Sequence, residues 1–106
     1  LTVFEKILPG SIKRLYYIYG VGQEAVRGGH RHRTAWHALM CLTGHCTVSV
    51  HDGSSEHEYV LDRPTVGLLL APQDWRKMHS FTADALLLIV SNAYYDPADY
   101  IYEYYG

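Results

Sequence analysis

The stretch from Arg27 to Leu39, RGGHRHRTAWHAL, concentrates three histidines and three arginines just before the chain turns apolar. Imidazole groups bind metal ions, and they also exchange protons close to neutral pH. Arginine side chains bind phosphate groups through paired hydrogen bonds. The stretch is therefore a candidate metal site, a candidate proton-transfer site or a candidate phosphate site.

A β-strand through this stretch would sort its side chains onto two faces. Residues two apart in a strand share a face, so His30 and His32 point one way while Arg31 and Arg33 point the other way. The glycines at 28–29 let the backbone bend or approach a ligand closely. If the histidine face looks into a barrel, the two imidazoles line one pocket, and the two arginines face solvent or the edge of a bound nucleotide.

The spacing of the histidines resembles the first motif of the cupin fold, in which a His-x-His pair is followed by glutamate and then glycine. His37 stands where the glutamate is usual. The second cupin motif would supply one more histidine after a proline, and in GLLLAPQDWRKMHSF that position falls at Arg76 or Lys77. A cation there would repel a divalent metal ion. A metal site of His30, His32 and His37 stays open as an alternative, with a positive charge where the fourth ligand belongs.

The rest of the chain predicts an all-β protein that positions these side chains. Gly, Pro and Asp clusters recur every ~8–12 residues, with short β-prone runs between them. We expect a short helical turn from Asp96, with Pro97 in its first turn. Many short antiparallel strands in a chain of this length predict a sandwich or a small barrel. The expected strands cover residues 1–6, 12–19, 26–32, 36–43, 45–50, 56–61, 65–70, 77–81 and 84–91.

Length and composition narrow the classes of protein. With 106 residues the chain is expected to form one domain, residues 1–106, with a single core. A net charge of −2 argues against a nucleic-acid or membrane-surface binder. No apolar run approaches the ~20 residues that span a bilayer. Cys41 and Cys46 lie in apolar surroundings and are interpreted as buried thiols in a reducing cytoplasm.

Two runs, GLLLA and ALLLIV, are apolar at every position and would be apolar on both faces of a strand. Such strands lie between two layers or at an interface between subunits.

Five runs in combination carry a narrower resemblance. They are IKRLYYIYGV, RGGHRHR, LMCLTGHCTVSVHDG, VGLLLAPQDWRKM and LLLIVSNAYYDPADYIYEY. From Leu1 nearly to Gly106 the chain resembles the WxcM-like sugar-nucleotide cupins, which include the dTDP-4-keto-6-deoxyglucose 3,4-ketoisomerases. The resemblance implies a jelly-roll β-barrel and a cytoplasmic homodimer. It also implies an isomerase of deoxysugar or polysaccharide biosynthesis, which moves a keto group between C4 and C3 of a dTDP-linked keto-deoxysugar without metal or cofactor.

The resemblance also implies roles for single residues. Acid–base work falls on His30 and His32, with His30 as the main proton-transfer residue, and Tyr16 supplies a nearby hydroxyl. A neutral imidazole can take a proton from C3 and return one at C4. The enediolate oxygen formed between these steps needs hydrogen-bond donors, which Tyr16, His32 or Arg14 can supply. Arg27 is a candidate contact to the sugar or the phosphates.

Four further residues complete the expected substrate-binding set. Trp75 is a candidate for stacking on thymine, and Arg33 for the nucleotide edge. His37 would add a base, hold His32 or simply pack, and Arg76 stands where many relatives have histidine. The tyrosine-rich tail is expected to be a packed lid or an interface rather than part of the site.

A non-catalytic sugar-nucleotide binding cupin is the remaining alternative. Members of the family usually carry a further leading segment that helps to build the site and can pass between subunits. A chain that begins at LTVFE keeps this alternative open.

Overall fold

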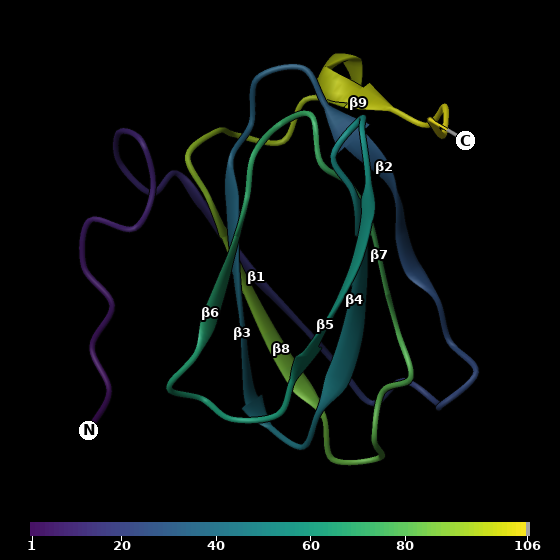
Figure 1. The fold of residues 1–106 in the computed structure, drawn as a ribbon. Helices are drawn as coiled ribbons and strands as arrows, with labels where there is room; N and C mark the ends of the chain where they lie inside the picture. Colours follow the sequence, from purple (N-terminus) through teal and green to yellow (C-terminus); the bar gives the residue numbers. More distant parts are fainter. Residues whose placement is uncertain (106) are drawn as a thin grey trace.

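The computed structural model describes residues 1–105, which form nine β-strands and one short 3₁₀ helix (Figure 1). Within this part of the chain, no helix is long and apolar enough to cross a membrane. The elements are β1 (Arg14–Tyr19), β2 (Arg27–His32), β3 (His37–Thr43), β4 (Cys46–His51), β5 (Glu56–Leu61), β6 (Gly67–Leu70), β7 (Trp75–His79), β8 (Leu86–Ser91), η1 (Pro97–Asp99) and β9 (Tyr100–Ile101).

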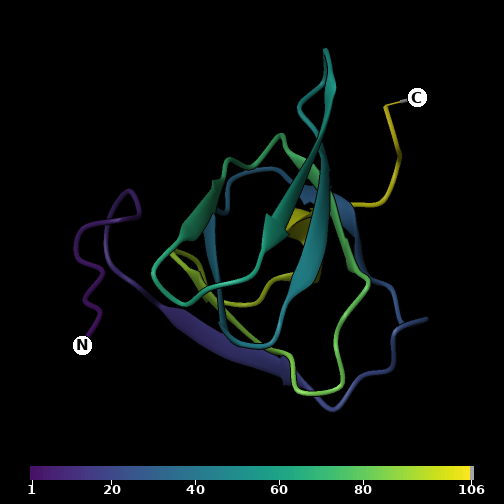
Figure 2. The same ribbon diagram turned by 60° about the horizontal axis from the view of Figure 1, so that its bottom comes forward.

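The strands form two antiparallel sheets that face each other. One sheet has the order β1-β8-β3-β6, and the other has the order β5-β4-β7-β2-β9. Figure 2 shows the two sheets on opposite sides of a common interior. The predicted all-β jelly roll is therefore confirmed, as a sandwich of two layers whose described strands are not joined by hydrogen bonds into one closed barrel.

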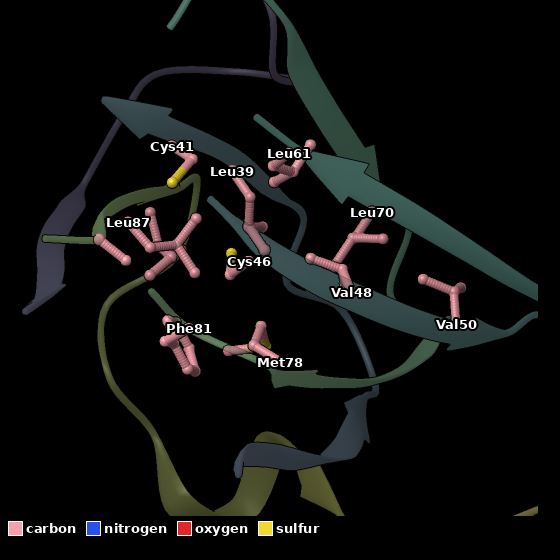
Figure 3. Packing of buried hydrophobic residues seen from close by; sticks show 12 residues of the cluster. Leu39, Cys41, Cys46, Val48, Val50, Leu61, Leu70, Met78, Phe81 and Leu87 are labelled. Carbon is pink, nitrogen blue, oxygen red and sulfur yellow. The ribbon is translucent and has the colours of Figure 1, made fainter. Parts of the chain in front are cut away.

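The core fills the space between the two sheets (Figure 3). Phe81 and Leu87 are completely buried there, as are the thiols of Cys41 and Cys46. Fully burying one large apolar side chain stabilises a fold by about 1.5–3 kcal/mol, so this cluster holds the layers together. Both cysteines are free, and their expected burial is confirmed. The cluster consists of Leu39, Cys41, Cys46, Val48, Val50, Leu61, Leu70, Met78, Phe81, Ala85, Leu87 and Ile89.

The predicted strand at residues 1–6 is wrong. This segment forms no strand, and instead Phe4, Ile7 and Leu8 pack against Met40 and Val90 on the outer face of the four-stranded sheet. Backbone groups within a sheet are already paired with neighbouring strands, so a segment that crosses its face has no free ladder to join. The segment is held by its apolar side chains instead of by strand pairing.

In the second half of the chain the observed elements agree with the predicted ones apart from small differences. The helical turn is confirmed, because the Asp96 carboxylate accepts a hydrogen bond from the amide of Ala98 at 3.0 Å and caps η1. The two-residue strand β9 was not predicted; it pairs with the end of β2, with Tyr100 opposite His32. Strand β7 begins at Trp75, two residues earlier than expected.

Candidate active site

A cavity of about 240 Å³ opens between the two sheets. Ligand pockets of proteins usually hold ~300–1,000 Å³, so this cavity accommodates part of a larger ligand, such as the sugar of a nucleotide-linked sugar. Its lining combines apolar side chains with charged and hydrogen-bonding groups, and both sheets supply both kinds. The polar lining residues are Arg14, Tyr16, Arg27, His30, His37, Arg76 and Tyr100, and the apolar ones include Leu39, Leu70, Met78 and Ile89.

Two glycines aim His30 into this cavity. Gly28 and Gly29 have φ angles of +86° and +80°, and the pairing of β2 with β7 shifts between Gly28 and His30. Such a bulge bends the strand and re-aims the next side chain. A Cβ atom at position 28 would lie 2.9 Å from the carbonyl oxygen of Arg76. The bend expected from the glycine pair is therefore present, and it places His30 opposite Arg76.

The three histidines of the opening motif lie together. The ring centroids of His30 and His32 are 4.9 Å apart with their planes at 84°, and those of His32 and His37 are 4.5 Å apart. His30 and His37 line the large cavity, whereas His32 is 4% exposed and lies behind them. The histidine that meets a ligand directly from β2 is therefore His30.

Asp99 holds the buried imidazole of His32. Its Oδ2 atom lies 2.9 Å from Nδ1 of His32. Burial alone would raise the pKa of Asp99, but hydrogen bonds from Thr34, His32 and the amide of Ala35 lower it. The carboxylate is thus ionised at neutral pH, with Oδ2 facing Nδ1 of His32.

A buried guanidinium forms the floor of the cavity. Arg76 is 3% exposed and makes no ion pair with a carboxylate of residues 1–105. Its Nε donates to the carbonyl of Asp74 at 2.7 Å, its Nη2 to the carbonyl of Ala71 at 3.0 Å, and its Nη1 to Nδ1 of His37 at 3.2 Å. Neutral acceptors hold this group, so its positive charge stays available to a ligand in the cavity.

The electrostatics keep the cavity histidines neutral. Burial, with the positive charge of Arg76, lowers the pKa of His30 to about 4 and that of His37 to about 2. Burial also lowers the pKa of Arg76 to about 10, so this side chain remains charged at neutral pH. At pH 7 the site therefore combines unprotonated imidazoles, which can accept protons, with a cation that stabilises negative charge.

Two tyrosines and Arg14 add hydrogen-bonding groups. Burial raises the pKa of Tyr16, so its hydroxyl stays protonated and can donate. The Arg14 guanidinium lies 4.4 Å from the centroid of the Tyr16 ring, and its Nη1 donates to the Tyr100 hydroxyl at 3.2 Å. Arg14 and Tyr16 are two residues apart on β1 and share its inner face, and both line the cavity.

Not every predicted site residue reaches the cavity. Arg27 is exposed at its rim, where a phosphate could be met. Trp75 alternates with Arg76 along β7, so it lies on the outer face of the sheet, against Tyr104 with ring centroids 4.7 Å apart. Arg33 lies beyond the end of β2 and donates from Nε to the carbonyl of Ala98 at 3.2 Å. The structure thus separates Trp75 and Arg33 from the residues that line the cavity.

Two residues of the tail belong to the site and were not predicted as site residues. The Tyr100 ring lies with its centroid 4.6 Å from those of both His30 and His32, and Asp99 holds His32. The expectation of a tail that is only a lid or an interface is therefore wrong for these two residues. The signal was the closing sequence YYDPADYI, which carried part of the family resemblance.

The histidine cluster does not fit a metal ion. Within residues 1–105, no three His, Cys, Asp or Glu side chains are placed to hold one. Nδ1 of His32 faces Asp99, Nδ1 of His37 faces Arg76, and the guanidinium of Arg76 occupies the floor of the same cavity. A positive charge in this place opposes a second cation.

A family model described as "FdtA: WxcM-like, C-terminal" matches residues 1–106. The chain belongs to the WxcM-like family. A curated relative, the TDP-4-oxo-6-deoxy-alpha-D-glucose-3,4-oxoisomerase of Aneurinibacillus thermoaerophilus, is 42% identical over 99 residues, which cover 93% of this chain and 71% of the relative.

Solved structures of enzymes that act on nucleotide-linked sugars share the fold. The sugar 3,4-ketoisomerase QdtA of Thermoanaerobacterium thermosaccharolyticum, in complex with TDP, is 38% identical with a TM-score of 0.87, over 92% of this chain and 71% of its own. The TDP-quinovose 3,4-ketoisomerase WlaRB of Campylobacter jejuni is 35% identical with a TM-score of 0.87, over 92% of this chain and 75% of its own. The dTDP-4-dehydrorhamnose 3,5-epimerase of Bacillus anthracis, at 12% identity and a TM-score of 0.77, shares the fold alone.

Proposed function

We propose that this protein is a 3,4-ketoisomerase of a dTDP-linked 4-keto-6-deoxyhexose. The observation that carries the proposal is the pairing of an unprotonated His30 with the buried cation of Arg76 in one sugar-sized cavity. The relatives named above at 35–42% identity are 3,4-ketoisomerases by name. We further propose that one cytoplasmic domain, residues 1–106, carries out this step in the biosynthesis of a deoxysugar, and that the reaction needs no metal or cofactor.

His30 is the proposed base. It takes the proton from C3 of the 4-keto sugar, which leaves an enediolate with its charge on the C4 oxygen. The proton of the C3 hydroxyl then passes to the C4 oxygen, and a proton returned to C4 gives the 3-keto product with a hydroxyl at C4. Its imidazole is neutral because burial and Arg76 depress its pKa. A positioned base of this kind typically contributes ~10²- to 10⁴-fold to the rate.

Arg76 and Tyr16 are the proposed partners of the enediolate oxygens. Arg76 offers a charge fixed by three hydrogen bonds to neutral acceptors, and Tyr16 offers a protonated hydroxyl. Preorganised donors at a developing negative charge stabilise the transition state without reorganisation. Removing one such donor typically costs ~10²- to 10³-fold in kcat.

The nucleotide part of the bound substrate is proposed to extend out of the cavity past Arg27. The cavity is too small for a whole nucleotide-linked sugar, and Arg27 is the exposed arginine on its rim. A guanidinium binds a diphosphate through paired hydrogen bonds. Arg14 lies deeper, between Tyr16 and Tyr100, and is proposed to contact the sugar.

A homodimer is proposed from the outer face of the four-stranded sheet. Leu15, Tyr17 and Tyr19 project from β1 on this face and are 57%, 57% and 68% exposed. Leu69 of β6, on the same sheet, is 48% exposed. A row of large exposed apolar side chains on a sheet is typical of a protein–protein interface. A second copy of the chain is the proposed occupant.

The function is tested by incubating the protein with dTDP-4-keto-6-deoxyglucose and following the sugar ring by NMR. We expect the keto signal to move from C4 to C3, with solvent deuterium appearing at the exchanged carbon in D₂O. Folded protein that binds dTDP and leaves the keto group in place would support the non-catalytic alternative instead.

A further inference from the structure

The carboxylate of Asp99 receives four hydrogen bonds where β2 ends and β9 begins. Oδ1 accepts from the amide of Thr34 at 2.9 Å and from its hydroxyl at 2.8 Å. Oδ2 accepts from the amide of Ala35 at 3.3 Å and faces Nδ1 of His32 at 2.9 Å. The Thr34 contacts fix the orientation of the carboxylate independently of His32, so Oδ2 is held in place as an acceptor.

This arrangement determines which nitrogen of His32 carries a hydrogen. An ionised carboxylate only accepts hydrogen bonds, so the hydrogen of His32 lies on Nδ1. Nε2 is buried and has no hydrogen-bond partner within residues 1–105. A protonated Nε2 at this place would be an unsatisfied buried donor, which costs about 1–3 kcal/mol.

The position of His32 connects this choice to the cavity. The imidazole packs edge to face against His30, and the rings of His37 and Tyr100 surround it at centroid distances of 4.5 and 4.6 Å. When His30 takes a proton it becomes a cation beside Arg76. If His32 is neutral and its Nε2 carries a lone pair, it favours the protonated form of His30. If His32 is itself a cation, or carries its hydrogen on Nε2, it opposes the protonated form of His30.

We propose that Asp99 is a positioning residue, which holds His32 as the neutral Nδ1–H tautomer so that its buried Nε2 carries a lone pair rather than a hydrogen. Asp99 does not line the cavity and acts through His32. The kinetic part of this inference rests on the proposed isomerase function, and the structural part, the tautomer, does not.

Asp99→Asn is the decisive variant. The asparagine can keep the hydrogen bonds from Thr34 through its oxygen, while its amide nitrogen takes the place of Oδ2. There it points hydrogens at Nδ1 of His32 and no longer accepts the long hydrogen bond from the amide of Ala35. His32 must then accept at Nδ1 and carry its hydrogen on Nε2. Thr34→Val is the matched control, because it removes one hydrogen bond to Oδ1 and leaves the His32 contact intact.

The test combines ¹⁵N NMR of the histidine rings without substrate with steady-state kinetics. We expect the Nδ1–H form of His32 in the wild type and in T34V, and the Nε2–H form in D99N. We also expect kcat to fall at least ~10-fold in D99N with KM changed less, and to stay within ~2-fold in T34V. A wild-type His32 found as the Nε2–H form or as imidazolium would overturn the proposal, even if D99N failed to fold.

Two further outcomes separate the claims. A folded D99N protein with the wild-type kcat would overturn the positioning role. A wild type with the expected tautomer and no isomerase activity would contradict the proposed function alone.

Discussion

Nη1 of Arg76 donates a hydrogen bond of 3.2 Å to Nδ1 of His37, so a buried cation rests on a neutral imidazole. His37 is thus an acceptor that orients Arg76. Burial, and after it the charge of Arg76, depresses the pKa of both His37 and His30.

Replacing Arg76 with methionine tests this coupling. The Arg76→Met variant removes the charge that helps to depress the pKa of His30, so that pKa should rise above 4 toward the ordinary value of 6.5. NMR titration of the His30 ring measures this even in an inactive protein. We also expect kcat to fall by ~10²- to 10³-fold. An unchanged His30 titration would show that burial alone sets its protonation.

The two glycines before His30 offer a matched pair of variants. Both have a positive φ, which costs an alanine about 1–2 kcal/mol. The Cβ of Gly28→Ala would also meet the carbonyl of Arg76 at 2.9 Å, whereas Gly29→Ala meets nothing within 4 Å. We expect G28A to lose more unfolding free energy than G29A in denaturant titrations, and to lose more activity. Equal losses would contradict the close approach of β2 to β7.

The site could be predicted from the sequence where it depends on strand alternation and family motifs. The His-x-His pair and the glycines before it indicated one polar pocket, and His30 lines it as expected. Alternation also explains why Trp75 does not line the cavity as predicted. Trp75 and Arg76 are neighbours on a strand, so a buried Arg76 places Trp75 on the opposite face. The two could not both have lined the pocket.

Other features depend on packing that no local pattern encodes. Residues 1–6 are a short β-prone run, but whether such a segment pairs at an edge or lies across a face depends on which backbone groups are free. Asp99 is 67 residues from His32 in the chain, so their contact follows only from the pairing of β9 with β2.

Acid should destabilise the fold through His37. Its pKa is about 2 in the folded protein and near 6.5 when unfolded, so the unfolded chain binds more protons below pH 6.5. Stability is therefore complete above pH 6.5 and falls as the pH decreases, by on the order of 2 kcal/mol for this residue at pH 5. Urea titrations at pH 7 and pH 5 measure the change. His37→Asn should make the dependence shallower, with part of it retained because the pKa of His30 is also depressed. An unaltered slope would contradict a neutral buried His37.

The proposed dimer is tested through its exposed strand. Tyr17→Lys places a charge in the middle of the exposed face of β1, so we expect the variant to elute as a monomer in size-exclusion chromatography with light scattering, while the wild type elutes as a dimer. Val60→Lys is the control, because Val60 is equally exposed, at 60%, but lies on the other sheet. If V60K eluted as a monomer and Y17K as a dimer, the interface would lie on the five-stranded sheet and not on the exposed face of β1.

The most direct test of His30 as the base is the isomerisation rate of wild type and His30→Asn across pH, with dTDP binding measured in parallel. Asparagine has a similar size and cannot take the C3 proton. We predict that wild-type kcat/KM falls on the acid side with a midpoint near pH 4, as the pKa of His30 requires, and that H30N binds dTDP but turns over at least ~10²-fold more slowly. An H30N enzyme with wild-type turnover would contradict the account.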